Sequence, residues 1–94
     1  MLAFIRERQA DVLHDAISAL ESSSPADLRD VVHTVHGSLG SYGLGTAHAR
    51  IHELATVLAD PATTADRAAH ERRATVSELR SIEAGMALST GTTT

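Results

Sequence analysis

The helical pattern of this chain is clearest in residues 24–45, which read SPADLRDVVHTVHGSLGSYGLG. Ser24-Pro25 is a helix start signal, because a serine hydroxyl accepts hydrogen bonds from free backbone N–H groups and proline suits the first helical position. Apolar residues then recur at spacings of three and four along one stripe: Leu28, Val31, Val32, Val35, Leu39 and Tyr42. Gly43 and Gly45 supply a stop. The stretch therefore predicts an amphipathic helix over about residues 25–42.

Three further segments are predicted to be helical: residues 2–21, 46–59 and 63–86. Each carries apolar residues at helical spacing, and no proline interrupts any of them. We expect Thr46 to cap the third helix and Asp60-Pro61 to end it. In the last segment, Arg72 takes a place where the stripe expects an apolar residue, so we expect its guanidinium to snorkel to the surface.

These segments predict the fold class. No stretch alternates with the period of two that is typical of a strand, and no internal repeat is visible. The pattern therefore predicts an all-α fold, an antiparallel four-helix bundle with up-down-up-down topology and short loops. We expect one domain over residues 1–88 and a disordered tail over residues 89–94, which has nothing to bury. Six apolar residues should be buried together: Val32, Val35, Leu39, Ile51, Leu54 and Leu79.

Composition excludes several classes of function. The 94 residues contain no cysteine, which rules out a disulfide framework, a thiolate metal site and a cysteine nucleophile. The net charge of −4 argues against a nucleic-acid-binding protein, which would show a basic patch. No stretch approaches 18 consecutive apolar residues, and the first eight residues lack the features of a signal peptide. We therefore expect a soluble, cytoplasmic protein with no membrane contact.

The candidate site lies on the second predicted helix. At about 100° per residue, His33 falls roughly 140 to 150° from the centre of the apolar stripe, so it should point to solvent. Arg29 lies one turn before it and Gly37 one turn after it on the same outer strip, with Gly40 a turn further and His36 toward the flank. Each glycine inside a helix costs about 1 kcal/mol relative to alanine. Close approach by a partner is a reason to keep both.

This arrangement suits phosphoryl transfer through an imidazole. A neutral imidazole has a free lone pair near pH 7 and can attack phosphorus without a general base. Gly37 would leave one flank of the ring open, while Arg29 and His36 could balance the added negative charge. No carboxylate cluster on this face has metal-ligand spacing, so Mg²⁺ would come from the partner. The pattern predicts a phosphate relay and not an enzyme.

The string His33-Thr34-Val35-His36-Gly37-Ser38, with Gly43 ten residues beyond His33, resembles the motif of histidine-containing phosphotransfer (HPt) domains of bacterial two-component phosphorelays. The resemblance implies a helical bundle in which His33 is phosphorylated, Gly37 admits the response regulator and Gly43 closes the helix. It also implies receiver domains and a sensor or hybrid histidine kinase as partners. We expect a monomer. The family's lysine is replaced here by His36, and Arg29 is the candidate substitute for its charge.

Other readings of these residues stay open. The bundle could bind a receiver or kinase without being phosphorylated, and His33 could be a plain surface histidine. His36 is an alternative phosphorylation site, because Gly40 follows it by four residues as Gly37 follows His33. His48 and His52, spaced i,i+4, could bind a metal, although both fall on the polar flank of their helix and we favour no metal site. The remaining two histidines are interpreted as surface residues: His14 and His70.

Overall fold

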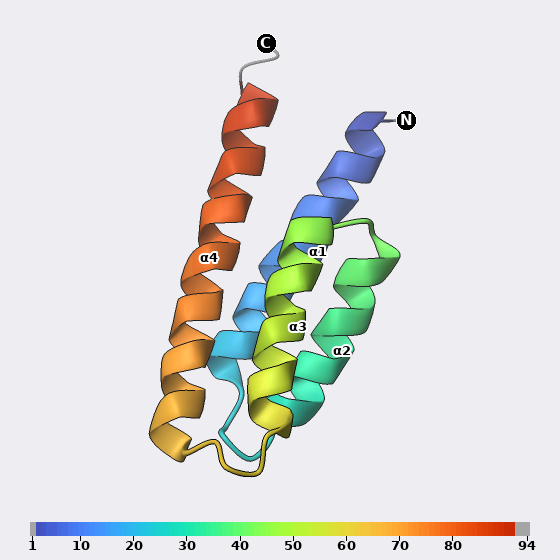
Figure 1. Cartoon of the computed structure of the whole chain (residues 1–94). Coiled ribbons are helices and arrows are strands. Elements are labelled where there is room, and N and C mark those ends of the chain that lie inside the picture. Colours follow the sequence, from blue (N-terminus) through green and yellow to red (C-terminus); the bar gives the residue numbers. More distant parts are fainter. Residues whose placement is uncertain (1, 92–94) are drawn as a thin grey trace.

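The computed structural model describes the backbone of residues 2–91 and the side chains of residues 7–86. It contains four α-helices, α1 (Leu2–Ser22), α2 (Leu28–Ser41), α3 (Gly45–Ala59) and α4 (Ala65–Gly91). Each helix packs against its neighbours along the chain, and α4 also packs against α1, which closes the bundle (Figure 1). Within the described residues the backbones of the two diagonal pairs, α1 with α3 and α2 with α4, lie further apart, with no Cα atoms within 8 Å of each other. The predicted all-α, antiparallel four-helix bundle is confirmed.

The bundle is long and narrow, with principal extents of 48 × 21 × 20 Å. In Figure 1, α1 and α4 run beyond α2 and α3 at the end of the bundle where the α2–α3 turn lies. None of the helices in the described part of the chain has the length and apolar character needed to cross a membrane.

The core is aliphatic and takes residues from every helix. The six residues predicted to be buried together are all in it, with Leu39, Ile51, Leu54 and Leu79 fully inaccessible. Tyr42 departs from the predicted stripe, because its side chain is 37% exposed. Its backbone carbonyl accepts a hydrogen bond from Gln9 and its hydroxyl one from Arg8, so Tyr42 ties the end of α2 to α1.

The start of α2 lies later than predicted. The helix begins at Leu28 and not near residue 25, because residues 25–27 form a separate turn. The N–H of Asp27 donates to the backbone carbonyl of Ser24 at 3.1 Å and lies 3.3 Å from its hydroxyl. Ser24 therefore closes a turn that precedes the helix, and Asp27 takes the cap position without a side-chain cap bond.

Two other predicted boundaries also differ. Thr46 does not cap α3, because the helix begins at Gly45 with Leu44 as the cap residue. The C-terminal end of α4 also differs: the helix continues to Gly91, since no proline follows the end of its apolar stripe at Met86. The prediction of a tail from residue 89 was therefore too early for residues 89–91. The rest of the predicted tail, residues 92–94, lies outside the described residues.

Two arginines join helices in a way that the periodicity did not indicate. Arg72 is half-buried, and its guanidinium donates to the carbonyl of Ser23 at 2.7 Å, at the end of α1. Its guanidinium ends at the C-terminus of α1, because the unpaired carbonyls at a helix C-terminus attract a cation. Arg50 of α3 forms ion pairs with Glu78 at 2.8 Å and Glu71 at 3.4 Å, both on α4.

Candidate functional site

The turn between α2 and α3 sets the register of the site. Gly43 follows the C-cap residue Tyr42 and has φ of 71°, a left-handed conformation that glycine adopts without strain. The N–H of Gly43 donates to the carbonyl of Gly40 at 3.3 Å, and the N–H of Leu44 donates to that of Leu39 at 3.1 Å. This pair of bonds is a Schellman motif. Leu44 is at the same time the cap residue of α3, so only three residues, 42–44, separate the two helices.

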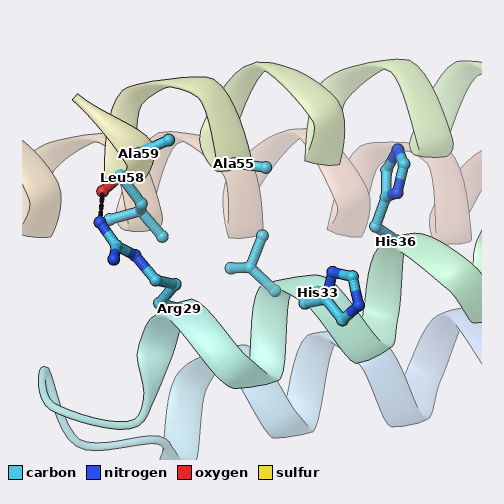
Figure 2. Close-up of a pocket in the computed structure, with 7 residues that line it drawn as sticks. Arg29, His33, His36, Ala55, Leu58 and Ala59 are labelled. Carbon is cyan, nitrogen blue, oxygen red and sulfur yellow. Dashed lines mark hydrogen bonds between the residues drawn. The ribbon is translucent and has the colours of Figure 1, made fainter.

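His33 is exposed at the edge of a hollow between α2 and α3. The hollow has a volume of about 320 Å³ and is lined by seven residues: Arg29, Val32, His33, His36, Ala55, Leu58 and Ala59. Figure 2 shows the His33 ring lying over α2 itself, while the His36 side chain is directed from α2 toward α3. Within the described residues no hydrogen bond holds the His33 ring. The structure thus brings His33, His36 and Arg29 to one hollow.

Arg29 is held at the end of the hollow nearest the C-terminus of α3. Its guanidinium donates to the backbone carbonyl of Leu58 at 2.6 Å, which Figure 2 shows as a dashed line. Leu58 lies in the last turn of α3, where carbonyl groups lack helical partners and favour a cation. Arg29 therefore holds a fixed positive charge beside the hollow, with the rest of its guanidinium free to meet an anion.

His36 packs against α3 and not against solvent. Its ring is half-buried and stacks on His48, with ring centroids 4.0 Å apart and planes 25° from parallel. The centroid of His52 is 5.5 Å away. The Nε2 atom of His36 is buried and has no hydrogen-bond partner. Burial, followed by the charges of His48, His52 and His33, lowers the pKa of His36 below 6.5. The neutral form of His36 is therefore favoured.

The two glycines of α2 have different surroundings. A Cβ atom built on Gly37 would meet no atom within 4 Å, so nothing inside the molecule requires a glycine there. A Cβ atom on Gly40 would lie 3.2 Å from Cδ2 and 3.3 Å from Nε2 of His48. Gly40 therefore has an internal role, because it gives the His48 ring room to stack on His36. The prediction that it is kept for partner access does not account for this contact.

The contact of His36 with α3 was missed by reading helices one at a time. His48 and His52 were expected on the polar flank of their helix, yet both rings lie near His36. The proximity of His36 and His48 could have been predicted from how many residues separate each of them from Gly43. In an antiparallel helix pair, residues at similar distances before and after the turn lie opposite each other. His36 precedes Gly43 by seven residues and His48 follows it by five.

The stacked rings of His36 and His48 are not oriented to share one metal ion. Imidazole binds a metal through a lone pair in the plane of the ring, and two nearly parallel rings cannot direct these lone pairs at one point. In the part of the chain that the structure describes, no group of three or more histidine, aspartate or glutamate residues is placed to hold a metal ion.

Comparison with known protein families agrees with this geometry. A family model described as the Hpt domain matches residues 1–87, which include all four segments that pack in the bundle. The chain belongs to the Hpt domain family. Hpt domains are phosphotransfer carriers of two-component phosphorelays, where they interact with receiver domains and kinases. No curated protein and no solved structure matches this Hpt domain.

Membership of the Hpt family makes the residue at position 36 notable, because it differs from the family's motif. The resemblance noted above puts a lysine of the family at the place of His36, and this Hpt domain carries no lysine anywhere. Positive charge near His33 therefore comes from Arg29, which is bonded to the Leu58 carbonyl, and from histidines when they are protonated. The electrostatics of this site thus depend on pH in a way that a lysine would not allow.

Proposed function

We propose that this Hpt domain accepts a phosphoryl group on His33 from the aspartyl phosphate of one receiver domain and passes it to the aspartate of another. The observation that carries the proposal is the exposed, unbonded imidazole of His33 beside the open position at Gly37. A receiver's phosphoaspartate can approach such a ring along α2 without meeting a side chain at position 37. Arg29 and His36, which line the same hollow, are the proposed phosphate contacts.

The proposed step needs no base from this chain. The lone pair of the neutral His33 ring attacks phosphorus, a new N–P bond forms, and the P–O bond to the receiver's aspartate breaks. The aspartate leaves as a carboxylate, while the second ring nitrogen of His33 keeps its proton. Mg²⁺ would come with the receiver, bound by carboxylates of that partner. The reverse step transfers the group to the next receiver, so the domain acts as a carrier and not as an enzyme.

The test is incubation of the full chain with a phosphorylated receiver and Mg²⁺. The chain should gain a phosphate that is labile in acid and stable in base, as expected of a phosphoramidate. His33→Gln should abolish this label, whereas His70→Gln, an exposed histidine on α4, should leave it unchanged. His36→Gln should reduce the label at most, and His36→Lys should raise the yield by supplying a fixed charge.

Two outcomes would overturn this assignment. Label that is lost in His36→Gln and kept in His33→Gln would make His36 the acceptor. If the receiver binds the chain but wild type gains no label from any phosphorylated receiver, the domain is an interaction module that binds receivers without accepting phosphate.

A further inference from the structure

The resting state of His36 is unusual for a residue beside a phosphate acceptor. Its ring lies between α2 and α3, its Nε2 atom is buried without a partner, and its nearest neighbour is the His48 ring 4.0 Å away. A positive charge on this ring would face other imidazoles and no carboxylate. The surroundings of His36 therefore favour an uncharged ring in the unphosphorylated protein.

The groups around His36 can be named helix by helix. On α2 they are His33 and Arg29, which line the same hollow, and on α3 they are His48 and His52. The titratable residues of α1 that lie near α2 are Arg8, at Tyr42, and Asp15, in a hollow beside Thr34 and Ser38. Neither is among the main causes of the His36 pKa shift, and in the described residues no Cα atom of α4 lies within 8 Å of one in α2. The ring thus has cationic or neutral groups close by.

A phosphoryl group on His33 reverses this balance. His33 lies three residues before His36 on the same helix, and its charge already acts on the His36 ring. In the resting protein this influence lowers the pKa of His36, because two like charges repel. A phosphoryl group carries a charge between −1 and −2 near neutral pH, and an adjacent anion favours the protonated imidazole.

We propose that phosphorylation of His33 is coupled to the uptake of one proton by His36, which then serves as the counter-ion of the phosphoryl group. This rests on the proposed function. The proton comes from solvent when the phosphoryl group arrives, and it returns to solvent when the group leaves for a receiver. A lysine at this place would present its charge at all times. Here the counter-charge appears only with the phosphate and below a certain pH.

The coupling has a definite sign. Protonation of His36 favours the phosphorylated form, so the equilibrium yield of phosphoprotein should rise as pH falls between the His36 pKa of the phosphorylated protein and the lower pKa of the free one. A single coupled proton changes the equilibrium constant by at most about tenfold per pH unit. Outside this window the contribution of His36 to the yield is constant.

The first test does not depend on any receiver. His33→Glu places a negative charge at position 33, and His33→Gln is the neutral control of equal size. The pKa of His36 is measured by NMR titration of its ring protons. Their signals are assigned as those that disappear when His36→Gln is combined with each position-33 variant. We expect a higher His36 pKa in His33→Glu than in His33→Gln. Equal values in the two variants, or a lower value in His33→Glu, would overturn the coupling.

The second test uses the phosphoryl group itself. A phosphoramidate salt, which phosphorylates exposed histidines chemically, is applied to wild type and to His36→Lys between pH 6 and 8. At each pH, the yield of phosphorylated His33 in wild type is divided by the yield in His36→Lys. This ratio should increase several-fold from pH 8 to pH 6, since only wild type takes up a proton. Parallel pH profiles would overturn the proposal. Failure of receivers to label the chain would refute the proposed function, while the His33→Glu titration would still decide the coupling.

Discussion

The rings of His36 and His48 lie face to face across the α2–α3 interface, with centroids 4.0 Å apart. Stacked neutral imidazoles attract each other, whereas two protonated rings at this distance repel. The same contact that joins the helices thus also penalises a charge on His36. Both properties can be measured.

Stability should decrease on acidification through His36. The folded pKa is below the ordinary value of 6.5, so the folded protein binds fewer protons than the unfolded chain in this range. The contribution is fully present above pH 6.5, falls as pH drops below that value, and is lost below the lowered folded pKa. Urea denaturation at pH 7.5 and 5.5 should show a smaller loss for His36→Gln than for wild type, and an unchanged loss for the control His70→Gln. Equal losses in all three would contradict this prediction.

Gly37 and Gly40 should respond differently to alanine. Gly37→Ala should stabilise the domain by up to about 1 kcal/mol, because alanine favours the helix and its Cβ meets nothing. Gly40→Ala should gain less or lose stability, because its Cβ would lie 3.2 Å from the His48 ring. In a His48→Ala background, Gly40→Ala should gain as much as Gly37→Ala does. Denaturant midpoints test this, and equal gains for both glycines in wild type would show that His48 moves aside freely.

A larger side chain at position 37 should separate stability from transfer. Gly37→Gln should keep a helix-propensity gain of a few tenths of a kcal/mol while slowing phosphoryl transfer to His33, because it covers one flank of the ring. Gly37→Ala is the matched control, with the gain in stability but little added bulk. Transfer rates from a phosphorylated receiver check this. A rate for Gly37→Gln equal to that of Gly37→Ala would remove the access argument.

Arg29 should contribute to both the fold and the yield of phosphoprotein. Arg29→Gln removes the fixed charge and weakens the bond to the Leu58 carbonyl, so it should destabilise the domain by about 1 kcal/mol or less and lower the equilibrium yield. Arg29→Lys should retain more of the yield than Arg29→Gln. Arg67→Gln, an exposed arginine on α4, is the control for net charge. Arg29 plays no part in phosphate binding if Arg29→Gln and Arg67→Gln give the same yield.

Arg72 should matter for stability alone. Arg72→Met keeps the hydrocarbon stem but removes the donors to Ser23, and should destabilise the domain by about 1 to 3 kcal/mol. Arg73→Met, at the exposed neighbouring position, should change stability by about 0.5 kcal/mol or less. Thermal or urea unfolding gives both numbers. Similar effects of the two substitutions would mean that the bond to the α1 end contributes nothing.

The bundle could be predicted because its helices are separated by clear stop signals and carry apolar stripes. Leu39 and Ile51 fall on these stripes and are fully buried, and His33 falls opposite the stripe of its helix and is exposed. Helical periodicity settles such positions, since it fixes the angle of a side chain about its own helix. The helix ends were less accurate, because Ser24 closes a turn before α2 instead of starting it.

The partners of flank residues could not be predicted in the same way. His36 lies at the edge of its stripe, and whether that edge meets α3, α1 or solvent depends on the direction in which the bundle turns. The periodicity of one helix carries no information on that direction. The acceptor of Arg29 is a backbone carbonyl, which every residue possesses, so no side-chain pattern could single out Leu58.

The short connection between α2 and α3, residues 42–44, has a consequence for how such a domain can change over time. Leu44 completes the Schellman motif of α2 and begins α3, so an inserted residue here would turn one helix by about 100° relative to the other. That rotation would carry His48 away from His36. The connection of residues 60–64 between α3 and α4 has no such shared residue. Length variation among descendants of this chain should therefore accumulate at residues 60–64 and be purged at the Gly43 turn, which makes that turn the fixed reference point from which the positions of the histidines are counted.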